Sequence, residues 1–167
     1  YDDALSQYFV AKKVLPYNVN LIRFAGLCYF NQNQLAEAEK YFLNYLTMDP
    51  DSPPVLNDLG SIYFRQAKYD EAIVIFQRAI ITSKTKKFYA ITEYSKPAYA
   101  EPHLNLAGAY VFKNRLDDAI SECRKALQID PGLVGARNML SALYREKGDD
   151  DRARAVLDRR NDTAAGG

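Results

Sequence analysis

A short string centred on alanine recurs along this chain of 167 residues. Its five copies are YDDAL, LAEAE, YDEAI, LDDAI and DDRAR, and their alanines are separated by 34, 34, 47 and 34 residues. The alanines are Ala4, Ala38, Ala72, Ala119 and Ala153. A fixed period of about 20 to 50 residues is typical of a stacked array, in which no unit buries its apolar face without its neighbours. The spacing therefore predicts a solenoid.

Three further columns of residues keep the same register. The tyrosine column consists of Tyr29, Tyr63, Tyr110 and Tyr144. Three residues before each tyrosine stands a small residue, namely Gly26, Gly60, Ala107 and Ser141. Four residues after each repeated alanine stands a bulkier one, namely Tyr8, Phe42, Phe76, Cys123 and Leu157. Residues spaced by three and four lie on one face of a helix, so each unit is predicted to contain two closely packed helices.

The order L-G-x-x-Y, then A-x-x-x-F, then P resembles the tetratricopeptide repeat family over about residues 1 to 160. The prolines that close three of the units are Pro16, Pro50 and Pro131. The resemblance implies an all-α fold, a right-handed α-solenoid of stacked antiparallel helix pairs. The chain departs from the family pattern where tryptophan is usual. It has no Trp, and the residues at those places are Ile22, Leu56, His103 and Arg137.

The period divides residues 1–160 into a single array with one insertion. Its predicted parts are the second helix of a truncated repeat (1–18), repeats at 19–52, 53–83 and 98–133, an insertion at 84–97, a capping repeat at 134–160 and, beyond the array, a disordered tail at 161–167. Each turn between paired helices needs a residue that tolerates positive φ. The residues at these turns are Asn33, Ala67, Asn114 and Gly148. Ala67 should fit least comfortably, and Ser52 offers an N-cap just before Pro53.

The first segment matches only the second helix of a unit. The chain also begins with Tyr instead of Met, so we expect a fragment of a longer array or the loss of upstream residues. A missing first helix would leave exposed the face that bears Ala4, Tyr8 and Ala11. Because an exposed apolar stripe tends to find a partner, we expect self-association, or association with another subunit, through this end.

The 47-residue interval adds 13 residues to the regular period. Its candidate contact residues are Lys84, Lys86, Lys87, Phe88, Tyr89 and Tyr94. Basic and aromatic side chains together could meet phosphates and stack bases. Phe88 and Ile91 nevertheless follow Ile80 at helical spacings, which favours a second helix that runs on until Pro97 stops it. The insertion could then act as a partner contact or as a spacer.

The sequence contains no recognisable catalytic motif, since GxGxxG, P-loop, HExxH and GxSxG strings are all missing from it. Acid pairs such as Asp70 and Glu71 recur at the first turn of the second helices, where they complement the helix dipole. One histidine, His103, without clustered carboxylates or thiols is a poor metal ligand or triad member. Cys28 and Cys123 fit small core residues better than a disulfide. We therefore expect no enzyme, cofactor, metal site or small-molecule substrate.

In proteins similar to this one, the first helices of successive units line a concave groove that receives a partner segment. Carried over by position, the groove residues here would be Asn20, Arg23, Phe24, Leu27, Phe30, Asn57, Asp58, Ser61, Phe64, Arg65, Glu101, Leu104, Asn105, Gly108 and Phe112. The aromatic and aliphatic members could anchor apolar side chains, while the arginines and asparagines could bond a partner backbone. For Phe30 and Phe64, packing between helices is an equal alternative.

Chaperone-binding members of the family resemble one another in clamping a C-terminal carboxylate with Lys, Asn and Arg side chains. In this chain Leu27, Asp58 and Glu101 stand among the corresponding places. Two acids and a leucine would repel or fail to solvate a terminal carboxylate. We therefore do not expect a chaperone tail as the ligand.

These residues favour a non-catalytic adaptor or scaffold that binds other proteins through a peptide or helix segment. An alternative is a structural subunit of a larger secretion, pilus or membrane-associated assembly. Nucleic-acid contact through the insertion is a weaker alternative, because the formal net charge of +1 provides no strong attraction for phosphates. We recognise no targeting or membrane-spanning segment, and the sequence leaves the cytoplasm and the periplasm open.

Overall fold

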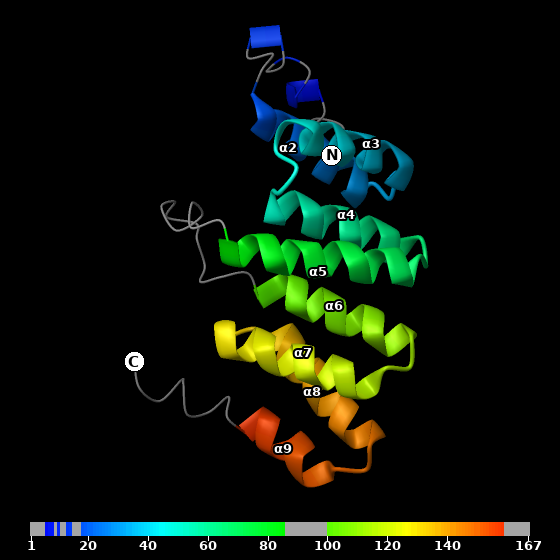
Figure 1. Ribbon diagram of the computed structural model, residues 1–167, viewed down its shortest axis with the longest axis vertical. Helices are drawn as coiled ribbons and strands as arrows, with labels where there is room; N and C mark the ends of the chain where they lie inside the picture. The colour runs from blue at the N-terminus through cyan, green and yellow to red at the C-terminus, as the bar shows by residue number, and fades with distance from the viewer. Residues whose placement is uncertain (1–5, 9, 11–12, 15–17, 86–99, 159–167) are drawn as a thin grey trace. The chain divides into compact units, whose positions relative to one another are not determined.

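The computed structural model of the chain describes residues 6–8, 10, 13–14, 18–85 and 100–158. Within these ranges the regular structure is α-helical and contains no β-strand, which confirms the all-α fold (Figure 1). The chain forms two compact units, Tyr1–Thr85 and Lys86–Gly167. The single array over residues 1–160 stays a prediction.

The first unit contains two helix pairs. Its helices are α2 (Val19–Asn31), α3 (Leu35–Met48), α4 (Pro53–Arg65) and α5 (Tyr69–Thr85). Helix α2 packs against α3, and α4 packs against α5, so each pair lies side by side in Figure 1. Helix α4 also contacts both α3 and α2. The second pair therefore stacks on the first, as the repeat pattern predicts.

The second unit repeats this arrangement. Its helices are α6 (Ala100–Phe112), α7 (Leu116–Ile129), α8 (Val134–Glu146) and α9 (Asp150–Asp158). Helix α6 packs against α7, and α8 packs against both α7 and α9. Ala153 of the short helix α9 is fully buried, while its other residues are exposed or partly buried.

The turns inside all four helix pairs use the same backbone device. Each has one residue with φ between 56° and 76°, namely Asn33, Ala67, Asn114 and Gly148. The next residue donates its backbone N–H to the carbonyl of the column tyrosine, over 2.8–2.9 Å, at Gln34, Lys68, Arg115 and Asp149. This bond, six residues back to one, defines the Schellman motif that ends a helix. The predicted turn residues are thus confirmed, and the tyrosine column also marks the carbonyl that the turn requires.

The column glycines of the first unit allow a phenylalanine to pack directly on the helix backbone. A Cβ atom added to Gly26 would lie 2.5 Å from the ring of Phe42, and one added to Gly60 would lie 2.6 Å from Phe76. The second unit instead has Ala107 and Ser141 in the small column, and the bulky column there holds Cys123 and Leu157. A smaller partner leaves room for a side chain, so the two columns are complementary in size.

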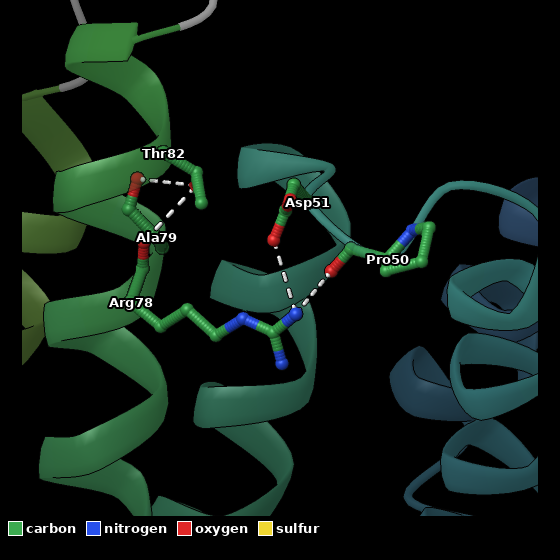
Figure 2. Close-up of polar contacts among 5 residues, drawn as sticks. All are labelled: Pro50, Asp51, Arg78, Ala79 and Thr82. Atoms are coloured by element: carbon green, nitrogen blue, oxygen red, sulfur yellow. Dashed lines mark hydrogen bonds and ion pairs between the residues drawn. The ribbon is translucent and has the colours of Figure 1, made fainter.

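Polar contacts also tie α5 to the loop between α3 and α4. Arg78 of α5 donates from one terminal nitrogen to the backbone oxygen of Pro50, over 2.8 Å, and to the Asp51 carboxylate, over 3.0 Å (Figure 2). Thr82 turns back on its own helix and donates to the carbonyls of Arg78 and Ala79. Pro50 and Asp51 end the first pair and begin the second, so Arg78 fastens the junction between them.

The structure corrects the expectation for the first segment. Tyr8 is buried, with 2% of its surface exposed, and its ring packs edge-on against Tyr41 of α3 with the centroids 5.9 Å apart. Tyr8 is therefore not part of an exposed stripe, because α3 covers it. Ala4 and Ala11 lie outside the described residues. Val10 and Val14 are exposed instead.

Two smaller expectations have mixed outcomes. Ser52 occupies the N-cap position before Pro53, but its side chain makes no capping hydrogen bond, whereas Asn18 does cap α2. Lys84 lies exposed near the end of α5, so the second helix does continue into the insertion. The other candidate residues of the insertion, Lys86, Lys87, Phe88, Tyr89 and Tyr94, lie outside the described residues. Their contact role stays a prediction.

Candidate partner-binding surface

The predicted groove residues of the first unit lie on its two first helices. Those on α2 are Asn20, Arg23, Phe24, Leu27 and Phe30, and those on α4 are Asn57, Asp58, Ser61, Phe64 and Arg65. Helices α2 and α4 contact each other. The structure therefore brings these ten residues onto neighbouring helices of one compact unit, and we call this set the α2–α4 surface.

A charged pair joins the two helices of this surface. The Nε of Arg23 on α2 lies 2.8 Å from Oδ2 of Asp58 on α4, and only 14% of the Asp58 side chain is exposed. Burial raises the pKa of the Asp58 carboxyl above its ordinary value, and the Arg23 guanidinium acts in the opposite direction. Arg23 thus stabilises a carboxylate that burial alone would disfavour. We predicted a partner backbone for Arg23, and the structure shows that part of its hydrogen-bonding capacity serves α4.

A second link lies near the C-terminal ends of the same helices. Arg65 of α4 donates to the backbone oxygen of Phe30 over 3.1 Å, and its guanidinium carbon lies 3.9 Å from the centroid of the Phe30 ring. A cation over an aromatic face contributes about 0.5–1 kcal/mol at an exposed site. The two arginines come from different helices, since Arg23 of α2 bonds a residue of α4 and Arg65 of α4 bonds a residue of α2. They hold the α2–α4 surface in one register.

The apolar members of the surface differ in how far they are available to a partner. Leu27 and Phe30 are partly buried against the core formed by Ala38, Phe42, Val55 and Ile62. The Phe64 ring packs edge-on against Tyr69 of α5, with the centroids 5.5 Å apart. Phe24 is 45% exposed. The packing alternative thus describes Phe30 and Phe64 well, and Phe24 is the large apolar side chain that this surface presents to solvent.

The polar members of the surface have local partners. Ser61 donates to the backbone oxygen of Asn57 one turn earlier in α4, over 3.0 Å. The backbone N–H of Asn20 donates to Oδ1 of Asn18, the N-cap of α2, while the Asn20 side chain is exposed. Asn20, Phe24 and Leu27 fall at i, i+4 and i+7 along α2, so they share one helix face.

The remaining predicted groove residues lie on α6 of the second unit. Glu101 is exposed, Leu104 and Asn105 are half-buried, and Gly108 is buried. Leu104 packs against Gly135 of α8, where an added Cβ would lie 3.0 Å from a Leu104 methyl carbon. Phe112, the last residue of α6, is 60% exposed. The predicted groove is therefore represented by two sets of residues, one in each unit.

Sequence reasoning missed a buried hydrogen bond between two titratable side chains in the second unit. The Nδ1 of His103 on α6 lies 2.5 Å from Oε2 of Glu122 on α7, and Lys125 donates to the other carboxylate oxygen over 2.6 Å. Burial alone would raise the pKa of Glu122, but the hydrogen bonds from His103 and Lys125 lower it below its ordinary value. This agrees with the interpretation of His103 as a structural residue, and its hydrogen-bond partner is Glu122. The only signal was a histidine in a packing column, with a glutamate before the next bulky column residue.

Both cysteines lie in the interior of their units. Cys28 and Cys123 are buried free thiols, and burial raises the pKa of Cys123 to about 12. Within the described ranges, no three His, Cys, Asp or Glu side chains come close enough to share a metal ion. No helix in the described part of the chain is long and apolar enough to cross a membrane.

Comparison with known proteins agrees with this architecture. A sequence profile of the tetratricopeptide repeat family matches residues 29–84 and 113–166, and a second profile of the family matches residues 57–134. The chain belongs to the tetratricopeptide repeat family. It is 32% identical over 98 residues to the TPR repeat-containing thioredoxin TTL4 of Arabidopsis thaliana, which covers 59% of this chain and 12% of that protein. The chain thus spans a small part of this relative.

Two solved structures share the fold. The Cut9–Hcn1 hetero-tetramer of the APC/C superposes with a TM-score of 0.80 at 21% identity, over 99% of this chain and 31% of that one. The first TPR of Spaghetti (RPAP3), bound to the HSP90 peptide SRMEEVD, has a TM-score of 0.66 at 19% identity, over 78% of this chain and 93% of that one. Both likenesses confirm stacked helix pairs as the architecture.

Proposed function

We propose that this chain is a non-catalytic scaffold that binds a segment of a partner protein on the α2–α4 surface. The names of two similar structures support the general role, since one is a hetero-tetramer and the other contains a bound peptide. The observation that carries the proposal is the exposed Phe24. A large apolar side chain with 45% exposure stands on a surface whose two helices are held in register by two arginine links.

Phe24 acts as the apolar anchor in this proposal. Aromatic anchors in a well-ordered surface dominate many interfaces, and truncating one costs about 2 kcal/mol or more. Asn20 lies one turn before Phe24 on the same face and can bond the backbone of a partner segment. Because Arg23 and Arg65 already fasten α2 to α4, the surface loses little conformational freedom on binding.

The bound segment is an internal one and not a chain terminus. A terminal carboxylate needs several cations without counter-charges. Arg23 faces Asp58 at 2.8 Å, and Arg65 is stacked on Phe30. The basic side chains of this surface are therefore committed within the unit, which agrees with the sequence argument against a chaperone tail.

The test is a selection of displayed peptides against the intact chain, followed by affinity measurements for the enriched sequences. Phe24→Ser should weaken these peptides at least tenfold while the helical circular dichroism signal stays unchanged. Leu43→Ser is the matched control, because Leu43 is 46% exposed on α3 of the same unit. Equal losses for the two variants, or no loss for Phe24→Ser, would refute the α2–α4 surface as the binding site.

A structural subunit of a larger assembly is the second candidate function. Helix α5 exposes Val74 and Ile81, seven residues apart on one face, with 61% and 63% of their surfaces accessible. Two exposed aliphatic side chains on a helix face suit contact with a folded neighbour better than with an extended peptide. If Val74→Ser together with Ile81→Ser releases a co-purifying subunit that Phe24→Ser retains, this second function takes precedence.

A further inference from the structure

A groove runs over three helices of the second unit. It consists of two adjoining hollows of about 580 Å³ and 650 Å³, lined by residues of α7, α8, α9 and the loops between them. The residues that line both hollows are Arg124, Gln128, Tyr144 and Arg152. The residues that line it do not include the predicted groove residues on α6, so it is a different surface of the second unit.

Basic side chains dominate the charge of this groove. Its basic lining residues are Arg124, Lys125, Arg137, Lys147 and Arg152, against the acids Asp117 and Asp149. The whole chain carries a formal charge of only +1. Positive charge is therefore concentrated here, and we call this the basic groove. A cleft lined by one sign of charge attracts ligands of the opposite sign.

The acids of the basic groove are already paired with two of its cations. Lys147 donates to Asp117, and Nε of Arg152 lies 3.1 Å from Oδ2 of Asp149. Arg124 is exposed and has neither a hydrogen bond nor an ion pair within the described residues. Arg124 lines both hollows, so a guanidinium that has no counter-charge among the described residues stands where they meet.

Two more basic residues of the groove form hydrogen bonds within the second unit. Lys125 donates to Glu122 over 2.6 Å, and buried Arg137 donates to the backbone oxygen of Pro131. These bonds leave Arg124 as the main electrostatic contact for a ligand, with Arg152 beside it. The Arg152 guanidinium carbon lies 5.8 Å from the centroid of the Tyr144 ring, and this contact helps to hold the Arg152 side chain over the ring.

The second hollow adds an apolar wall. Leu127 of α7, Leu140 of α8 and Val156 of α9 line it together with Ala155. A free phosphate or a nucleic-acid backbone has no apolar group to pack against an aliphatic wall. A peptide can place one apolar side chain there and carboxylates beside it. The combination of the Arg124 guanidinium and an aliphatic wall thus favours a peptide over a polyphosphate.

The first unit shows that this charge is a property of the side chains and not of the fold. The positions 81 residues earlier hold Leu43 in place of Arg124 and Glu71 in place of Arg152. Tyr63 stands in the place of Tyr144, and its phenol has a raised pKa, first through burial and then through Glu39 and Glu71. Around this tyrosine the first unit therefore has two glutamates and Lys68, and it lacks both arginines.

We propose that the basic groove binds an acidic segment of a partner protein, in which an apolar residue lies beside Asp or Glu. Arg124 receives a carboxylate in the bidentate geometry that guanidinium favours, and Arg152 provides a second donor above Tyr144. The apolar residue of the segment contacts Leu140 and Val156. This site is separate from the α2–α4 surface, so the chain can hold two partner segments at once.

The experiment uses an array of octapeptides built from Glu and Ser with one Leu at each position, and a matched array with Gln in place of Glu. The intact chain should retain several acidic peptides and none of their Gln counterparts, and their affinities should fall as salt is raised. Arg124→Glu should weaken the retained peptides at least tenfold. Arg145→Glu, an equal charge change at an exposed position of α8 outside the groove, should change them less than twofold.

Three results would overturn the proposal. These are equal retention of the Gln peptides, equal losses for Arg124→Glu and Arg145→Glu, and tighter binding of a single-stranded oligonucleotide than of any acidic peptide. Arg124→Leu, which introduces the first unit's residue, guards against misfolding caused by the introduced charge. Phe24→Ser should leave acidic-peptide binding unchanged, so failure at the basic groove and failure at the α2–α4 surface are told apart.

Discussion

The first and second units place different chemistry at the same positions of one repeat. In both units the first helix of each pair ends in the same positive-φ turn, with the same bond to a column tyrosine. Between α2 and α3 the first unit has Ile22 and Tyr41, and Tyr41 packs against Tyr8 and Tyr29. The positions 81 residues later hold the buried pair His103 and Glu122. One unit closes its helix pair with aromatic rings, and the other with a charged hydrogen bond.

The comparison separates two sets of positions in the repeat. The turn residues, the alanine column and the tyrosine column determine how the helices pack, and they are alike in both units. The positions between them determine charge and exposure, as Leu43 and Arg124 illustrate. A repeat can therefore change its ligand without changing its backbone, because stacking depends on a few residues in each unit.

The largest effect should come from giving the second unit the residue of the first at position 103. His103→Ile removes a hydrogen-bond partner from Glu122, whose side chain is only 11% exposed. Leaving a buried, charged acceptor without one of its donors costs about 1–3 kcal/mol or more. Hydrogen exchange of the α6 and α7 amides should show this loss of stability at neutral pH. The double variant His103→Ile/Glu122→Tyr copies the first unit and should lose less.

The same pair gives the two units different responses to acid. Burial opposes ionisation of Glu122, but the bonds from His103 and Lys125 lower its pKa in the folded state. A folded pKa below the unfolded value of about 4.3 stabilises the fold above that pH, and this contribution is lost as the pH falls through the folded pKa. The wild-type second unit should lose more stability than the double variant between about pH 5 and pH 3. Equal losses would contradict a stabilising role for the pair.

An intermediate effect should follow from the size complementarity of the columns. Gly60→Ala adds a Cβ atom that would lie 2.6 Å from the Phe76 ring. Atoms of the first unit must therefore shift to accommodate it. Overpacking of this kind costs about 1–3 kcal/mol. Urea unfolding should show the loss, and a second change, Phe76→Leu, should recover part of it. Ala107→Gly in the second unit is the opposite change and should cost only about 0.5–1 kcal/mol. No recovery in the double variant would refute the coupling.

The smallest effect should be found at the turns. Ala67 has φ of 59° in the first unit, where a Cβ atom is unfavourable, and Gly148 has φ of 76° in the second. Ala67→Gly should stabilise the first unit by up to about 1 kcal/mol, and Gly148→Ala should destabilise the second by a similar amount. Thermal unfolding followed by circular dichroism can resolve such changes. A gain for Gly148→Ala would exclude this account of the turn.

The sequence predicted most of the fold because repetition supplied several independent signals for each element. Asn33, Ala67, Asn114 and Gly148 all adopt the predicted turn conformation. Charged contacts were harder to foresee. Asp58 follows Arg23 by 35 residues, one repeat and one further position, and only the stacking of α4 on α2 brings the two together. Glu122 could not be identified from the sequence either, because its position in the repeat has no preferred residue.

The basic groove shows the limit most clearly. Arg124, Lys147 and Arg152 belong to three different structural elements, and no short sequence window contains all of them beside Leu140. Their meeting depends on how α7, α8 and α9 pack. The exposure of Phe24 likewise depends on tertiary packing, whereas Phe64, which corresponds to Phe30 in the repeat, packs against Tyr69. Pattern reasoning named both phenylalanines but could not rank them.

The contact between Gly60 and Phe76 also constrains the order in which such a repeat can change over generations. A side chain gained at position 60 collides with the aromatic ring while Phe76 is present. Position 76 must therefore shrink first, and only then can position 60 acquire a methyl group without loss of stability. The second unit, with Ala107 and Cys123, stands at the far end of that path. After repeats are duplicated, the residues of these two columns can thus change in this order, the bulky residue first and the small residue second, but not in the reverse order.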